Sequence, residues 1–447
     1  MDLKAANIVL VHCHDLGRWL SCYGLPSVPS PSLSAFAERA VVFERAFSTA
    51  PLCSPARGSL FTGLSPHLHG LMGLTHHAWR YRENVTTLPE LLATHGYRTA
   101  LIGLQHENVD PSVLGFDVVG GVGFLPRAWQ VAHATEKWLE QNAGDKCAAP
   151  VFLTVGIWEV HRPWPSTDYS PSPASEVEVP PYLPDGASTR EDIGAFYGSI
   201  RQMDEAVGKL LDAVDRHLDP AETLIVFTTD HGAAFPGAKG TLYDTGTGVT
   251  LIMRPPTSWG VAPGRHKELV SHLDIVPTFL DIAGADAEAV AGYEGVSLVP
   301  LLRHGEACLG NAPVLSAGDR LLFSQKNFHD SYDPIRAIRS DRFKYIRNFG
   351  EGPRLTLSID LEDSPARRDF GDQHLQPRAV EELYDLERDP WERENVAADP
   401  AYASVRTALS ERLLQWMEEM QDPLLKGAIS PPPPRSRSVD ALPALKK

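Results

Sequence analysis

Short runs of apolar residues, most of them rich in β-branched side chains, recur along the first 300 residues. They span residues 7–11, 99–104, 151–157, 223–229 and 249–253. Continuous apolar runs of this length are typical of strands that are buried on both faces, as in parallel sheets. Stretches with apolar residues at helical spacing lie between them, for example residues 131–142 and 200–214. This alternation predicts an α/β fold in which helices sandwich a mostly parallel sheet.

Two helix starts are marked by particular residues. Thr87 and Glu90 have the spacing of a capping box, in which each side chain accepts a hydrogen bond from the other residue's backbone N–H. Asp274 precedes an apolar run that stops before Gly284, so we expect its side chain to cap a helix there.

The pattern changes after about residue 310. Residues 335–339 and 343–347 predict a hairpin, residues 383–386 another short strand, and residues 402–420 a helix with one apolar face. We therefore predict three parts: a catalytic α/β domain over 1–310, a smaller α+β domain with an antiparallel sheet over 311–426, and a proline-rich disordered tail over 427–447.

Charge and cysteine content restrict the classes of partner. The 447 residues carry a formal net charge of −16, which argues against nucleic acid and anionic membranes as partners. The chain reaches its first apolar run by residue 7, which leaves no room for a signal peptide, and no run is long enough to span a membrane. The five cysteines have no paired spacing. We expect a cytoplasmic protein without a disulfide framework.

Ligand-type side chains follow two of the predicted strands. His14-Asp15 comes just after the first run and Asp230-His231 just after the run over 223–229. If both strands are parallel and neighbouring, the two pairs meet at one sheet edge, where they can hold a divalent cation. Two alternatives remain open: Asp230 and His231 can simply cap a turn, and His12 with His14 has the alternation of a zinc pair, as in barrel amidohydrolases. A proline- and serine-rich loop over 163–189 is expected to cover this edge.

A third feature is the run from Leu52 to Gly63. Ser54-Pro55 suits the first turn of a helix, and Arg57 lies one turn after Cys53. A cysteine at a helix start beside an arginine is expected to be acidified, which favours nucleophile chemistry. The alternative is that Cys53 is a small buried apolar residue.

The run Cys53-Ser54-Pro55-Ala56-Arg57, followed by Ser59-Leu60-Phe61-Thr62-Gly63, resembles the sulfatase signature at every fixed position. Further similarity covers Asn7–Gly17, Phe227–Gly232 and Glu382–Asn395, and within the family the chain is most similar to heparan N-sulfatases (sulfamidases), for example over Gly70–His77. The resemblance implies an alkaline-phosphatase-like fold. It also implies that Cys53 is oxidised to formylglycine, whose hydrate attacks sulfur, and that Arg57 positions this residue. Asp15, Asp230 and the neighbour of each, His14 and His231, are then implied as ligands of a divalent cation beside residue 53.

Several positions depart from the family pattern. His14-Asp15 replaces Asp-Asp, and Asp230-His231 replaces the Asp-Asn of many members, so manganese or zinc suits the site at least as well as calcium. Leu104 stands where the family has a lysine, and Trp158 where it has a histidine. His106 and Lys239 match basic positions of the family, and His161 is a candidate replacement for the missing histidine.

The sequence thus predicts a hydrolase that cleaves a sulfate ester or N-sulfate, with Arg57, His106 and Lys239 holding the anion and leaving group. The alternatives are a phosphodiesterase or phosphonate monoester hydrolase of the same superfamily, and a non-catalytic relic of the fold. The expected partners are a small sulfated substrate and a formylglycine-generating enzyme; assembly into a homo-oligomer is left open.

Overall fold

A nine-stranded mixed sheet forms the centre of the computed structural model, which describes residues 6–123, 125–142, 149–304 and 320–433. The strand order is β4-β3-β5-β1-β6-β8-β2-β7, and β9 also pairs with β2. The bounds are β1 (Asn7–Cys13), β2 (Val41–Phe47), β3 (Arg98–Gly103), β4 (Val118–Gly120), β5 (Val151–Gly156), β6 (Thr223–Thr229), β7 (Gly248–Val249), β8 (Leu251–Arg254) and β9 (Gly264–Ser271). From β4 to β6 all neighbours are parallel, whereas β8 is antiparallel to both β6 and β2.

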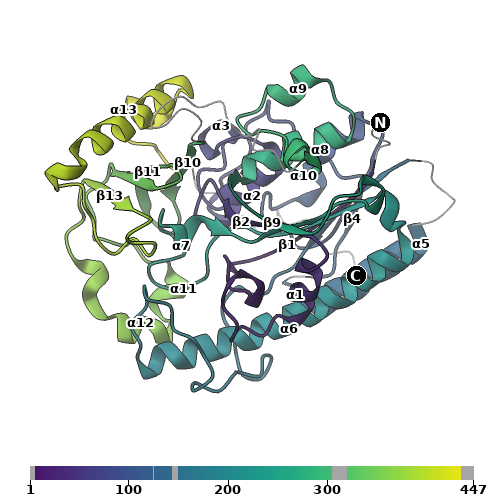
Figure 1. Ribbon diagram of the computed structural model, residues 1–447, viewed down its shortest axis with the longest axis horizontal. Coiled ribbons are helices and arrows are strands. Elements are labelled where there is room, and N and C mark those ends of the chain that lie inside the picture. Colours follow the sequence, from purple (N-terminus) through teal and green to yellow (C-terminus); the bar gives the residue numbers. More distant parts are fainter. Residues whose placement is uncertain (1–5, 124, 143–148, 305–319, 434–447) are drawn as a thin grey trace.

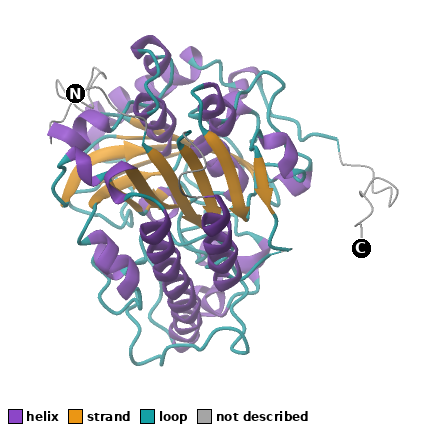
Figure 2. Ribbon diagram, turned by 90° about the vertical axis from the view of Figure 1, so that its right-hand side faces the viewer, coloured by secondary structure: helices purple, strands orange, loops and turns teal. Residues whose placement is uncertain are grey.

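Helices cover both faces of this sheet, as predicted (Figures 1 and 2). In β1, Val9 and Val11 belong to one apolar core, and Ile8 and Leu10 belong to the other. The first core is completed by α1 (Pro31–Ala37), α5 (Ala128–Asn142) and the long α6 (Ala187–His217), and the second by α2 (Cys53–Thr62), α4 (Leu88–Thr94), α8 (Ile275–Ile282) and α10 (Val299–His304). This period-2 alternation explains why the strand sequences are apolar throughout.

The register of the two central strands decides where the polar residues lie. Cys13 in β1 stands opposite Thr229 in β6. The residues that follow, His14-Asp15 and Asp230-His231, therefore leave the sheet side by side at the carboxyl edge. Asp15 adopts a φ of 49°, which is uncommon for a residue other than glycine and is often found at functional sites.

A second, antiparallel sheet occupies the C-terminal part of the chain (Figure 1). Its strands run in the order β10 (Leu322–Phe328), β11 (Tyr332–Arg339), β12 (Phe343–Asn348) and β13 (Glu381–Asp385), and α13 (Ala403–Glu419) packs on it. The predicted hairpin is thus β11–β12. Short helices α11 (Ile359–Glu362) and α12 (Pro365–Phe370) lie in the connection between β12 and β13.

Some predictions fall outside the described residues. The boundary predicted at residue 310 lies in the undescribed stretch 305–319, and residues 434–447 of the predicted tail are likewise not described. Cys13, Cys22 and Cys53 are free, whereas Cys147 and Cys308 fall in undescribed stretches. Within the described ranges, no helix has the length and apolar character needed to cross a bilayer.

Asp274 is the N-cap residue of α8, as predicted, but its side chain does not cap that helix. Thr87 and Glu90 do form the expected capping box at the start of α4. The Asp274 carboxylate, however, makes no capping hydrogen bond to α8. It accepts hydrogen bonds from the backbone N–H groups of Ser271 and Val296, at 2.7 and 2.9 Å. A 3₁₀ turn (His272–Asp274) precedes α8, and the Asp274 carboxylate belongs to the capping box of that turn. The sequence pattern alone placed this carboxylate at the start of α8.

Candidate active site

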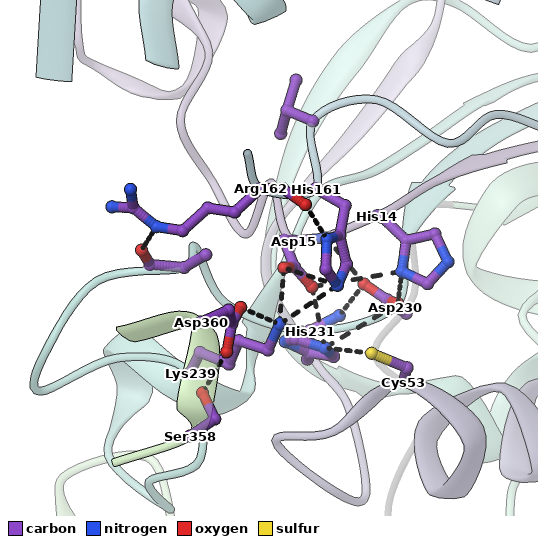
Figure 3. Close-up of polar contacts among 12 residues, drawn as sticks. His14, Asp15, Cys53, His161, Arg162, Asp230, His231, Lys239, Ser358 and Asp360 are labelled. Atoms are coloured by element: carbon purple, nitrogen blue, oxygen red, sulfur yellow. Dashed lines mark hydrogen bonds and ion pairs between the residues drawn. The ribbon is translucent and has the colours of Figure 1, made fainter. Parts of the chain in front are cut away.

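Cys53 is the first residue of α2, and it lies at the carboxyl edge of the sheet beside the two ligand-type pairs (Figure 3). Every residue of α2 is buried, and Cys53 itself is 2% exposed. Its Sγ lies 3.4 Å from Nε2 of His231. The predicted convergence of the cysteine with both strand ends is therefore present in the structure.

The thiol of Cys53 is not acidified. Burial raises its pKa above the ordinary value, and the charges of Lys239 and His231 offset this only in part. The sequence-based expectation of a low pKa fails because the desolvation of a fully buried thiolate outweighs the helix terminus and the neighbouring cations. An unmodified Cys53 is thus a poor nucleophile at neutral pH.

Four side chains offer ligand atoms within 4.8 Å of one another: His14, Asp15, Cys53 and Asp230. Nδ1 of His14 lies 2.9 Å from the Asp230 carboxylate, and Nε2 of His231 lies 3.1 Å from the Asp15 carboxylate. His231 stands outside the group of four but faces both Asp15 and Cys53.

The hydrogen bonding and protonation of these side chains are suited to binding a cation. Nδ1 of His14 and Oδ1 of Asp15 are buried without a hydrogen bond of acceptable geometry. Burial and the nearby Arg57 lower the pKa of His14 to about 3, so its imidazole is neutral and can act as a ligand. Burial opposes ionisation of Asp15 and Asp230, yet surrounding cations hold the pKa of both carboxyls well below the ordinary range. Two buried carboxylates and a neutral imidazole around one point form a suitable divalent-cation site.

Arg57 lies beneath this group and does not line the substrate cavity. Its guanidinium donates to the Cys13 carbonyl at 3.0 Å and to the Asp230 carboxylate at 3.2 Å, and it contacts Nδ1 of His12 at 2.6 Å. Arg57 therefore fixes Asp230, and its predicted role in holding the substrate anion stays a prediction. The same contact occupies His12, which belongs to neither candidate ligand group in the described residues, so the geometry does not support the zinc pair of His12 and His14.

Lys239 bridges two carboxylates at the floor of the site. Its Nζ lies 2.8 Å from Asp15 and 2.8 Å from Asp360, and 3.5 Å from Nε2 of His161 (Figure 3). Burial opposes its charge, but Asp15 and Asp360 raise the pKa of Lys239 well above the ordinary value. Asp15, His161 and Asp360 also form a second group with ligand spacing, and the Lys239 ammonium contacts all three of them.

A cavity of about 800 Å³ opens above Cys53. The predicted residues Cys53, His106, His161 and Lys239 line it. The loop that was expected to cover the site does so, since residues 162–166 and Pro171 form one wall. Arg162 holds this wall through a two-point ion pair with Asp192 of α6, at 2.8 and 2.6 Å.

The two departures from the family pattern do not line the cavity. Neither Leu104 nor Trp158 is among the lining residues. Trp158 stacks on His161 with ring centroids 4.2 Å apart, and so supports a histidine that does face the cavity. His106 stacks on His76, at 5.9 Å between centroids.

Asp360, Asp192 and Asp330 also line the cavity, and no sequence pattern identified them. Asp360 belongs to the four-residue helix α11, and no motif or period singles out that stretch. Asp192 lies on α6, which the spacing of apolar residues predicts. That spacing does not show which residue a polar side chain on the helix will contact. A charged residue that is more than nine-tenths buried, such as Asp192, becomes informative only once burial is known.

Comparisons with known proteins agree with this geometry. The Sulfatase family model matches residues 6–285. Human N-sulphoglucosamine sulphohydrolase is 29% identical over 94% of this chain and 91% of its own length. Among solved structures, a sulfatase of Bacteroides thetaiotaomicron from a locus for glycosaminoglycan metabolism has a TM-score of 0.74 at 18% identity, covering 95% of this chain and 98% of its own. The phosphonate monoester hydrolase of Agrobacterium radiobacter has a TM-score of 0.67 at 22% identity, covering 96% and 100%, and shows the same fold. The chain belongs to the sulfatase family.

Proposed function

We propose that the protein hydrolyses a sulfate ester or N-sulfate of a small molecule, using a formylglycine made from Cys53 and one divalent cation. Water and the ester are consumed, and an alcohol or amine, inorganic sulfate and a proton are produced. The observation that carries this proposal is the meeting of Asp15, Asp230 and His14 with Cys53, which lines a cavity together with Lys239. His14, Asp15 and Asp230, with His231 beside them, would hold the cation, which supplies positive charge to a sulfate oxygen.

The buried, unacidified thiol supports a modified residue 53. A thiol whose pKa is raised by burial gives little thiolate at neutral pH. A formylglycine at this position would supply an oxygen nucleophile as its hydrate.

Side chains of the cavity then have separate tasks. The Lys239 ammonium can donate a hydrogen bond to a sulfate oxygen, because it lies at the floor beside Cys53. Nδ1 of His161 contacts the Arg162 carbonyl, so Nδ1 carries the proton and Nε2, which lies 3.5 Å from Nζ of Lys239, is the acceptor nitrogen. Burial also lowers the pKa of His161, so the imidazole is neutral near neutral pH. His161 is therefore proposed to move a proton at Nε2, and His106 to contact the leaving group.

We expect Cys53 to be recovered as formylglycine from cells that contain a maturing enzyme. The reason is the unbroken recognition run Leu52–Arg57. Mass spectrometry of the tryptic peptide that contains residue 53 reads this directly, with an aldehyde-reactive hydrazide as a second probe. Protein from cells without a maturing enzyme is the control, and only unmodified thiol in both preparations would contradict the proposal.

A substrate panel separates sulfatase from its alternatives. Acidic side chains line the cavity at Glu191, Asp330, Asp360 and Asp363, and the chain carries a net charge of −16. Electrostatic repulsion should therefore disfavour long sulfated polymers before they dock. We expect higher kcat/KM for an aryl sulfate and for N-sulfoglucosamine than for a heparin chain. The fourth member of the panel is an aryl phosphonate monoester. If its kcat/KM exceeds that of the aryl sulfate by several factors of ten, at about 1.4 kcal/mol of activation free energy each, the phosphonate hydrolase alternative is established instead.

A further inference from the structure

The carboxylate that meets Lys239 comes from a distant part of the chain. Asp360 lies in α11, between β12 and β13 of the small sheet, and is 121 residues away from Lys239 in sequence. Its Oδ2 lies 2.8 Å from Nζ of Lys239 inside the cavity. The Lys239 side chain is 1% exposed, whereas that of Asp360 is 22% exposed. Asp360 therefore stands on the solvent side of the ammonium, in the space through which a substrate arrives.

The structure holds Asp360 in this position from two sides. The hydroxyl of Ser358 donates to Oδ1 of Asp360. The next residue, Ile359, donates its backbone N–H to the Asp330 carboxylate at 2.9 Å. Asp360 is thus a fixed negative charge and not a surface side chain that reached a lysine by chance.

Among the described residues, the lysine and the arginine that line the cavity are both already paired with carboxylates. Lys239 already contacts Asp15 and Asp360, and Arg162 is paired with Asp192. The side chains of Glu191 and Asp363 also line the cavity, and neither makes an ion pair or hydrogen bond with another described residue. A ligand that brings one negative charge can share Lys239 with Asp360. A second negative charge on the ligand is repelled by the Asp360 carboxylate, whatever attraction Lys239 and the proposed cation supply.

We propose that Asp360 is a specificity-determining residue that makes the site select singly charged sulfate esters over doubly charged phosphate monoesters. This inference rests on the proposed function. Sulfate and phosphate monoesters are both tetrahedral and present similar oxygen acceptors, so hydrogen bonding separates them poorly. Their charge differs, because a phosphate monoester has a second pKa near about 6 and is a dianion at pH 8. A fixed carboxylate beside the binding ammonium acts on that difference.

The test is the ratio of kcat/KM for an aryl phosphate to kcat/KM for the matched aryl sulfate, measured at pH 8 in matured enzyme. In Asp360→Asn, which keeps the size and the partner of Ser358, we expect this ratio to rise about tenfold or more. An aryl phosphonate monoester, which carries a single charge, should keep its ratio to the sulfate within about twofold. The comparison thus isolates charge from the identity of the central atom.

Asp363→Asn is the matched control, since it removes the same charge from the same cavity without touching Lys239. We expect it to change the phosphate-to-sulfate ratio less than about threefold, because solvent screens an exposed carboxylate. If Asp360→Asn turns over too slowly for kinetics, the dissociation constant of inorganic phosphate replaces the ratio. Calorimetry should then show it bound about tenfold more tightly than by the parent protein.

Two results would overturn the inference. The first is an unchanged phosphate-to-sulfate ratio in Asp360→Asn or, where that ratio cannot be measured, an unchanged affinity for inorganic phosphate. The second is an equal rise of the ratio in Asp363→Asn. Neither touches the proposed function, which fails separately if the matured parent enzyme does not hydrolyse any sulfate ester or N-sulfate. A parent enzyme that hydrolyses the sulfate, with a variant whose ratio stays flat, rejects the role of Asp360 alone.

Discussion

Replacement of Cys53 by alanine is expected to lower kcat for an aryl sulfate by roughly 10⁶-fold, the loss seen when an enzyme's nucleophile is removed. The side chain lies at the base of the cavity and no other described cysteine lines it, so no neighbouring thiol can take its place. Initial rates of matured parent and variant protein measure the effect. KM should change much less, since Lys239 and the cation site remain.

Cys22→Ala is the matched control, because Cys22 is a free, half-buried cysteine outside the cavity. It should leave kcat within about twofold, as expected for a substitution away from the reacting atoms. Retention of more than a hundredth of the activity in Cys53→Ala would show that residue 53 is not the nucleophile.

Asp230→Ala is expected to abolish metal retention and to destabilise the fold. The carboxylate accepts hydrogen bonds from the backbone N–H groups of Asp15 and His231, at 3.0 and 2.8 Å, and from Arg57 at 3.2 Å. Its removal leaves the fully buried Arg57 guanidinium without its carboxylate partner, which typically costs about 3–5 kcal/mol. Urea unfolding measures this loss, and elemental analysis measures the metal content.

Asp230→Asn tests charge against shape at the same position. The amide keeps an oxygen ligand, so this variant should retain a weaker site. Added manganese or calcium should raise the free energy of unfolding of the parent protein. The rise should be smaller for the Asn variant and absent for the Ala variant. Full metal occupancy in the Ala variant would remove Asp230 from the ligand set.

Much of the fold follows from local sequence patterns. Runs such as residues 7–11 and 223–229 identify buried strands, because both faces of the sheet are covered and both sets of side chains must be apolar. Once the two strands are taken as parallel neighbours, the meeting of His14-Asp15 with Asp230-His231 follows from geometry. The signature around Cys53 places the cysteine at a helix start, where the structure has it.

What local patterns cannot give is strand direction and long-range partners. An apolar run looks the same whether its strand is parallel or antiparallel, so the antiparallel β8 could not be distinguished from its neighbours. The pKa of Cys53 depends on burial by the whole fold, and the sequence showed only its helix position and the arginine. Asp360 reaches Lys239 through tertiary structure alone, and its stretch has no repeat that would draw notice.

The depth at which Cys53 lies also sets a time limit on any enzyme that must modify it. Once the chain has folded, residue 53 is 2% exposed and lines a cavity whose other walls include segments that are synthesised much later, among them those carrying Lys239 and Asp360. About 300 residues separate Cys53 from Asp360, so at about 5–20 residues per second the ribosome needs roughly 15 to 60 seconds to complete the cover. During that interval the segment around Cys53 is accessible, and afterwards residue 53 is reached only through the cavity. The yield of mature protein should therefore depend on translation speed, and slower synthesis should raise the fraction of chains that carry the modification.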